Sequence, residues 1–193
     1  DDRILVIDGG GTNSQTGAFC NYLDAEIGVG GTLHFMLLSH PHADHLAGLR
    51  SANQRYNVLH FYQTADYTAG ASATYGTFMG ELDAQGIGPN TPGVGPGTTY
   101  FEHAYGAYLS GATSTVNPPG YPNGWDINVR DRVIGAKKPY DAGTPNNNSM
   151  LHKMSLGTCS IYTGGDCESG CESGVLAENA SYTFAGVVAS EIN

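Results

Sequence analysis

The stretch LLSHPHADHLAGL, residues 37–49, contains three histidines and one aspartate within six positions. The apolar residues before this cluster predict a buried strand, so the cluster begins at a strand's carboxyl end, where ligands of α/β sheets commonly collect. His40 and His42 can face one centre, while Asp44 and His45 can turn toward a second. Imidazole nitrogens and carboxylate oxygens are suitable zinc ligands. The spacing therefore predicts a binuclear zinc site, and a solvated histidine-rich loop is the alternative.

The rest of the sequence predicts a mixed α/β chain. Apolar, β-branched runs bounded by turn residues indicate strands, and apolar residues at helical spacing indicate helices. We expect strands at 4–7, 33–39, 58–62, 126–134, 149–156 and 159–163, and helices at 46–57 and 75–85. The first strand ends at Asp8-Gly9-Gly10-Gly11, which predicts a turn with positive φ or a close backbone approach. A phosphate-binding loop is the alternative there, but no Gly-Lys-Ser/Thr follows.

Length and composition predict one domain. At 193 residues the chain is long enough for one substantial core and too short for two, so we expect a single domain over 1–193. Hydrophobic residues make up 40%, charged residues only 13%, and glycine occupies 28 positions, which indicates an uncharged, loop-rich surface. Segments rich in glycine and proline predict an insertion-like loop region at about 86–124.

The charge balance excludes some classes of partner. Eighteen acidic residues against eight Lys and Arg give a formal charge of −10. Such a field repels polyanions, so broad binding to nucleic acids or anionic membranes is disfavoured, whereas a divalent cation would offset part of the charge. No apolar run approaches the length that spans a bilayer. The composition favours an extracellular or periplasmic location and leaves a cytoplasmic one open.

The four cysteines are Cys20, Cys159, Cys167 and Cys171, which permit three pairings and lack the two-residue spacing typical of zinc-binding cysteines. Cys167 and Cys171 can close a small loop in an oxidising compartment, and free thiols are equally allowed. The tetrapeptide Cys-Glu-Ser-Gly occurs twice in succession over 167–174, a duplication too short to be a structural repeat.

These motifs resemble a known family. Residues 37–49 resemble the signature loop of the metallo-β-lactamase superfamily, and residues 4–10 resemble its earlier strand ending in Asp-Gly-Gly. Residues 146–149 and 160–166 are similar to the Asn-Asn-Ser strand and Gly-Asp turn of the branch that includes the hydrolase domain of competence DNA-uptake proteins and secreted phosphorylcholine esterases. The resemblance spans roughly residues 4–170 in the same order. It implies a four-layer αββα sandwich with the site at one edge between the sheets.

The resemblance also implies a ligand set and a mechanism. His40 and His42 would bind a first zinc ion, Asp44 and His45 a second, and Asp166 would bridge them. Metal-bound hydroxide would attack phosphorus or an acyl carbon, with no protein nucleophile. Asp44 would be the catalytic residue that orients the water.

One departure from the family concerns the second metal. The branch supplies a further histidine after the strand that follows Gly-Asp, and residues 182–188 could be that strand. No histidine follows His152, however. We expect that the polypeptide continues beyond Asn193, in slight preference to a second site that lacks a ligand in a weak or inactive relative.

Another departure concerns lactamase- and glyoxalase-type members, which carry an extra histidine between the first motif and the bridging aspartate. Apart from His152, which alternates with apolar neighbours, His60 and His103 are the candidates in that interval, and neither has the matching context. We expect His60 to be a half-buried strand residue and His103 to be structural as well, although it could reach substrate. His34 and His152 alternate with apolar neighbours and are assigned to structure.

These observations support three functions. The leading one is a zinc-dependent hydrolase of a phosphoester, with a phosphodiester or phosphocholine-like small-molecule substrate preferred over a β-lactam. The runner-up is a catalytically inactive extracellular structural or self-assembling protein that retains the fold, as a homo-oligomer or filament. The third, a thioester or lactam hydrolase, would need His60 or His103 to reach the first metal.

Overall fold

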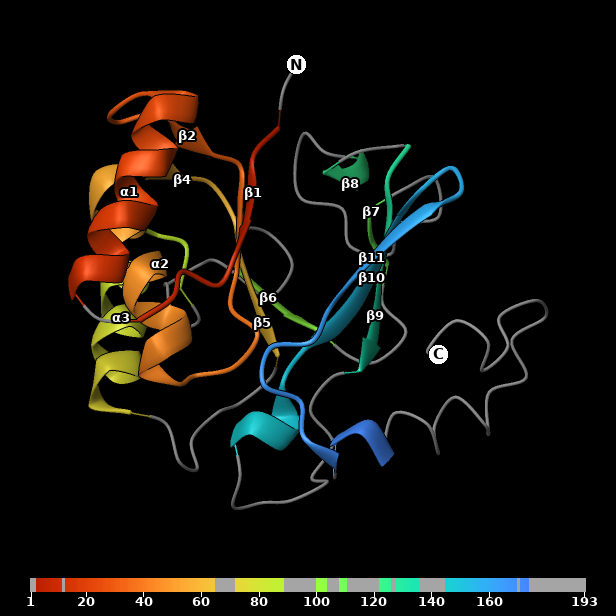
Figure 1. Cartoon of the computed structure of the whole chain (residues 1–193). Coiled ribbons are helices and arrows are strands. Elements are labelled where there is room, and N and C mark those ends of the chain that lie inside the picture. Colours follow the sequence, from red (N-terminus) through yellow and green to blue (C-terminus); the bar gives the residue numbers. More distant parts are fainter. Residues whose placement is uncertain are drawn as a thin grey trace.

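The computed structural model describes residues 3–11, 13–64, 72–88, 100–103, 108–110, 122–125, 128–135, 145–169 and 171–173. Over these residues the chain is mixed α/β, as its sequence predicts. Two larger sheets form neighbouring layers, and helices cover the outer face of one of them (Figure 1). None of the described helices combines the length and apolar character needed to cross a membrane.

The first sheet is parallel, in the order β1-β3-β5-β6. Its strands are β1 (Leu5–Ile7), β3 (Phe35–Leu37), β5 (Phe61–Thr64) and β6 (Tyr100–His103). In register, Leu5 pairs with Phe35 and Met36 with Phe61. Parallel neighbours need long crossovers. Helices α1 (Asn13–Ile27), α2 (Ala43–Arg55) and α3 (Ala73–Ala84) lie in these connections.

Two expected strands are split in the structure. The predicted strand at 33–39 becomes β2 (Thr32–Leu33) and β3, and that at 58–62 becomes β4 (Asn57–Val58) and β5. β2 and β4 pair with each other in a separate two-stranded sheet. At the break between β2 and β3, His34 Nδ1 accepts a hydrogen bond from Ile4 N at 3.2 Å. A change of partner sheet therefore interrupts each apolar run, and apolar pattern alone does not report such a change.

The second sheet is antiparallel, in the order β11-β10-β9-β7-β8. Its strands are β7 (Tyr108–Ser110), β8 (Pro122–Trp125), β9 (Arg130–Gly135), β10 (Leu151–Leu156) and β11 (Cys159–Thr163). The predicted hairpin is confirmed, since β10 pairs with β11 and Gly157 in the turn has φ 59°. Figure 1 shows this sheet on the side of the parallel sheet that faces away from α1, α2 and α3.

Alternation along β3 explains the layers. Met36 belongs to the apolar cluster that the helices cover, together with Leu46, Leu49 and Phe78. Phe35 and Leu37 point the other way and pack with Tyr62, Val133 and Met150 between the two sheets. Because successive strand residues face opposite sides, one short apolar strand serves both cores. The order of layers is helices, parallel sheet, antiparallel sheet.

Two features of the sequence were misjudged. Helix α1 was not predicted: its first turn is polar, and its core-facing residues, Phe19, Cys20, Leu23 and Ile27, lie only in its later turns. The region at about 86–124 was expected to be loop, but its described parts include β6, β7 and β8. These short strands are stabilised by pairing with sheet neighbours distant in sequence, which local composition does not reveal.

Candidate metal centre

The histidine loop, residues 39–45, runs from β3 into the first turn of α2. His42 is the N-cap residue of α2, with extended backbone angles of φ −73° and ψ 148°. The helix therefore begins at Ala43, three residues before the predicted start at Leu46. Asp44 lies in the first turn, where the helix dipole favours a negative charge. The backbone thus changes from extended to helical within the motif, and its two halves point in different directions.

Two groups of ligand atoms converge at this loop. His40, His42 and Asp166 form one group and Asp44, His45 and Asp166 the other, and within each group the donor atoms lie within 4.8 Å of one another. His40 Nε2 lies 3.1 Å from His42 Nδ1 and 3.8 Å from Asp166 Oδ2. His45 Nε2 lies 3.1 Å from Asp166 Oδ1 and 4.0 Å from Asp44 Oδ2. The five predicted ligands are together, and each group could hold a metal ion.

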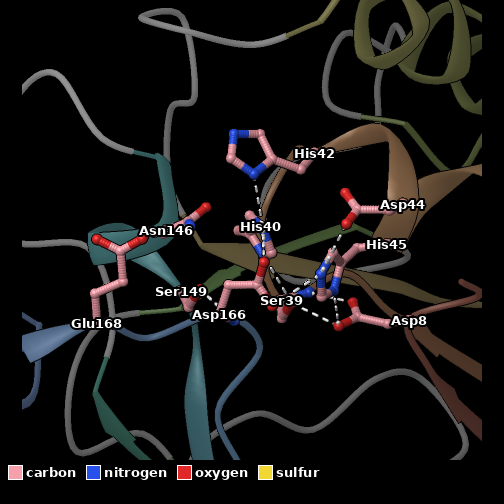
Figure 2. A network of polar contacts seen from close by, with 10 residues as sticks. All are labelled: Asp8, Ser39, His40, His42, Asp44, His45, Asn146, Ser149, Asp166 and Glu168. Carbon is pink, nitrogen blue, oxygen red and sulfur yellow. Dashed lines mark hydrogen bonds and ion pairs between the residues drawn. The ribbon is translucent and has the colours of Figure 1, made fainter. Parts of the chain in front are cut away.

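Asp166 is the residue that the two groups share. Its Oδ2 faces His40 and its Oδ1 faces His45, so one carboxylate spans both groups. Figure 2 shows this carboxylate beside the two imidazole rings, whose centroids are 4.1 Å apart. The side chain of His40 is fully buried, whereas that of Asp166 is 40% exposed and that of Asp44 is 70% exposed. The site is therefore closed on the His40 side and open on the Asp44 side.

Asp8 binds two residues of the histidine loop, Ser39 and His45, a role that the sequence did not indicate. Its Oδ1 accepts a hydrogen bond from Ser39 N at 2.8 Å, and its Oδ2 accepts one from Ser39 Oγ at 2.6 Å. The same Oδ2 lies 2.8 Å from His45 Nδ1. Because a carboxylate only accepts, His45 Nδ1 carries the proton, and in the neutral ring Nε2 then presents its lone pair to the centre.

Ser39 fixes the tautomer of His40 through a similar hydrogen bond. Its single hydroxyl proton is donated to Asp8, so Ser39 Oγ accepts from His40 Nδ1 at 3.1 Å. His40 Nε2 then also carries a lone pair toward the centre. Metal-ligating histidines usually donate their other ring proton in this way, which fixes the tautomer and the ring orientation. The donor set thus fits a divalent metal in chemistry as well as in position.

A close backbone approach brings Asp8 into reach. Asp8 itself has φ 51°, and the turn after it lies against the start of α2. Gly9 N donates to His45 O at 2.7 Å, and Gly48 N donates to Gly10 O at 3.1 Å. A Cβ on Gly48 would overlap the carbonyl of Gly9. The prediction of a turn with positive φ and a close backbone approach is confirmed.

The Asp166 turn, residues 164–168, comes from the other sheet. It follows β11, and Gly165 has φ 52° and packs against the hydroxyls of Ser39 and Ser149. Asp166 N donates to Ser149 Oγ at 3.3 Å. Beyond it, Asn146 Nδ2 donates to Glu168 at 2.8 Å. The Asn-Asn-Asn-Ser segment therefore contacts this turn, although most of it is a 3₁₀ helix, η1 (Pro145–Asn148), and not the strand that the resemblance implied.

The electrostatic surroundings separate two of the histidines. Burial, followed by the charges of His45 and His42, lowers the pKa of His40 to about 4. The hydrogen bond to Asp8 raises the pKa of His45. Neutral imidazole is the form that binds metal. Burial therefore favours the metal-binding form of His40, whereas Asp8 makes the His45 ring more basic.

The donor set is what indicates a metal centre. Neither the models of known protein families nor the sequences of curated proteins match this chain. The two donor groups together contain three imidazoles and two carboxylates, and Asp166 belongs to both groups. Such a donor set is suited to zinc and similar divalent metals. The arrangement could hold such ions next to each other and leave one side open to solvent and substrate.

The remaining histidines of the sequence analysis lie elsewhere. His60 is buried and stacks on Phe35, with ring centroids 5.3 Å apart. His152 is buried on β10, 3.2 Å from Asp131. Neither belongs to the two donor groups of the described residues. His60 was expected to be a half-buried strand residue, but it is buried and lies between β4 and β5. His103 is the last residue of β6, and only its backbone is described.

Proposed function

We propose that this protein is a zinc-dependent hydrolase of the metallo-β-lactamase type that cleaves a phosphoester, most favourably a phosphodiester. The single observation that carries the proposal is the position of Asp166, whose two oxygens face histidines of two different donor groups. A shared carboxylate is the arrangement expected for two adjacent cations. We propose that His40 and His42 hold the first ion, that Asp44 and His45 hold the second, and that Asp166 bridges them.

The residues of the chain would have distinct roles in this reaction. When bound, paired zinc ions would activate water as a nucleophile and stabilise negative charge on the phosphoryl oxygens. Asp44 is the most exposed of the five donors, so its carboxylate is available to orient the water and accept its proton. Asp8 and Ser39 would keep His40 and His45 in the tautomers that bind metal.

The proposed fold extends the layers already described. The order of helices, parallel sheet and antiparallel sheet matches three consecutive layers of an αββα sandwich. The histidine loop follows β3 at the sheet edge, and the Asp166 turn comes from the second sheet, as expected for a site between two sheets. We propose the four-layer sandwich on this basis.

The preference for a phosphoester rests on what surrounds the first group. A lactam or thioester hydrolase of this type would need His60 or His103 there. His60 is instead buried against Phe35, and His103 is the candidate that substitution would test. The contact of Asp166 with Ser149 supports the similarity to the phosphoesterase branch. The negative net charge of the chain favours a small substrate over a nucleic acid.

A second candidate function is a structural, self-assembling protein that keeps the fold without turnover. The observation that favours it is β11, which lies at the edge of the described second sheet and exposes Ile161 and Tyr162. Exposed apolar edge strands can pair with another copy of the chain. Light scattering at increasing protein concentration would distinguish the two, because only the self-assembling protein would form polymers.

The proposal is tested by zinc content and by hydrolysis of bis(4-nitrophenyl) phosphate. We expect the purified chain to bind two zinc ions and to hydrolyse this ester, and the His40→Ala variant to lose both properties. The exposed Glu26 on α1 offers a matched control, because Glu26→Gln removes a charge far from the site and should retain both. A chain that takes up no zinc, or that binds zinc without hydrolysing the ester, would refute the proposed activity.

A further inference from the structure

The duplicated Cys-Glu-Ser-Gly segment is not used by the proposed chemistry, yet it begins directly after the shared ligand. Cys167 follows Asp166 in sequence and forms a disulfide with Cys171. The other two cysteines, Cys20 and Cys159, are free. The bridge therefore closes a ring of five residues immediately next to the carboxylate that both donor groups share.

The segment closed by the disulfide is attached to the rest of the protein. Cys171 is buried, and its backbone N–H donates to Asn147 Oδ1 at 3.2 Å. Glu172 N donates to Glu168 O at 2.9 Å, which makes one helical turn across the bridge. Glu168 in turn accepts from Asn146 Nδ2 at 2.8 Å. Figure 2 shows Asn146 and Glu168 side by side on the flank of the site.

Asp166 is held through its carboxylate and on both sides of its backbone. Its side chain is 40% exposed, its Oδ1 lies 3.1 Å from His45 Nε2, and its N–H makes one long bond of 3.3 Å to Ser149 Oγ. Before it, Gly165 has a positive φ that favours glycine and packs against Ser39 and Ser149. After it, the chain continues into the disulfide-closed turn anchored on Asn146 and Asn147, so this turn limits where the carboxylate can move.

We propose that the Cys167–Cys171 disulfide is a redox-sensitive lock on Asp166. In the oxidised chain the lock holds the shared carboxylate in place, and its reduction lowers the affinity of the chain for metal. This inference rests on the proposed function, since it concerns the same donor groups. It adds that the site works fully only under oxidising conditions.

The reductant is a dithiol, which opens the bridge by thiol–disulfide exchange. One thiolate of the dithiol attacks Cys167 Sγ, which belongs to the less buried of the two cysteines, and Cys171 leaves as a thiolate that takes up a proton. The second thiol of the reductant then displaces Cys167, so the reductant gains an S–S bond and the protein gains two thiols. Two electrons and two protons pass from the dithiol to the protein.

The first test measures the order of the turn without any metal. Amide hydrogen exchange of the oxidised wild type should show a protected Cys171 N–H, because it is buried and bonded to Asn147. In the Cys167→Ser/Cys171→Ser variant the amide at position 171 should exchange at least about tenfold faster, whereas amides that pair β9 with β10 should be unchanged. Equal exchange at position 171 in both proteins would overturn the inference.

The second test measures zinc affinity by competition with a chromophoric chelator. The double serine variant has no thiols at the bridge that could bind zinc themselves, and we expect its affinity to be about 10- to 100-fold lower than that of the oxidised wild type. Wild type treated with dithiothreitol, then freed of it under argon, should show a similar loss of affinity. The Cys159→Ser variant is the matched control and should behave as wild type in both redox states.

The outcomes separate the two proposals. If the oxidised wild type binds zinc and the double serine variant binds it equally well, the lock is refuted and the proposed function stands. If the oxidised wild type binds no zinc at all, the proposed function fails and redox control of it fails too. In that case the exchange measurement still shows whether the bridge orders the Asp166 turn.

Discussion

The histidine loop and the Asp166 turn meet at the same centre, but they are held in different ways. The histidine loop is buried at His40, and Asp8 and Ser39 fix two of its rings through bonds of 2.6 to 3.1 Å. The Asp166 turn is more exposed: its carboxylate lies 3.1 Å from His45 Nε2, its N–H makes a 3.3 Å bond to Ser149, and a disulfide closes the segment beyond it. One half of the site is preorganised by burial and short hydrogen bonds, and the other is more open to solvent.

This difference assigns separate roles to the two regions. A ring whose tautomer and rotation are fixed loses little entropy when it binds a metal, so the histidine loop should set the basic affinity. The shared carboxylate is the only donor that both groups use, so the Asp166 turn should decide whether both ions are held. Four substitutions test this difference between the two regions.

The largest effect is expected for Asp166→Ala. Removing the shared carboxylate takes one donor from each group, so zinc affinity should fall by more than the roughly 100-fold upper end typical of losing an outer-shell partner. Isothermal titration with zinc should find at most one ion per chain. The exposed Glu26→Gln is the matched control, because it removes one carboxylate outside the donor groups. Two ions bound at wild-type affinity would contradict the bridging role.

The next largest effect is expected for Asp8→Asn. An amide that accepts from Ser39 N has only its NH₂ group left near Ser39 Oγ and His45 Nδ1, so the support of both rings is lost. We expect zinc affinity to fall by about 10- to 100-fold with no change in stoichiometry. The same titration distinguishes this result from that of Asp166→Ala. An unchanged affinity would mean that packing alone orients the histidines.

The backbone contact that places Asp8 is tested by Gly48→Ala. A methyl group there overlaps the carbonyl of Gly9, so the turn and the helix must separate. We expect a loss of about 1–3 kcal/mol in the free energy of unfolding, measured in urea. The exposed Gly80 on α3 is the matched control: a Cβ there meets nothing within 4 Å, and Gly80→Ala should stabilise by about 0.5–1 kcal/mol. Equal stability of the two variants would argue against the close approach.

The smallest effect is expected for Ser39→Ala. This change removes the hydroxyl that connects Asp8 to His40 and leaves the bond from Asp8 to His45 in place. Zinc affinity should fall by about tenfold at most, the lower end for an outer-shell partner. A loss as large as that of Asp8→Asn would show that the support of His40 dominates, and would place the preorganised part of the site on one ring.

Much of the fold was predictable from local pattern. The strands at 4–7, 149–156 and 159–163 and the helix at 75–85 lie within one or two residues of β1, β10, β11 and α3. Their apolar spacing and turn glycines are local signals. The helix at 13–27 and the strands at 100–103, 108–110 and 122–125 were missed, because their stability comes from packing against distant segments.

The histidine loop can be recognised as a source of metal ligands from its residues alone, since three histidines and an aspartate within one short loop are close in any fold. The folded chain is needed to show that the two oxygens of Asp166 face different histidines, that Asp8 fixes a ring 37 positions away, and that a disulfide closes the turn beside the shared ligand. The physical reason is that tautomers and carboxylate orientations are set by contacts between segments far apart in sequence, and those contacts exist only once the two sheets have packed.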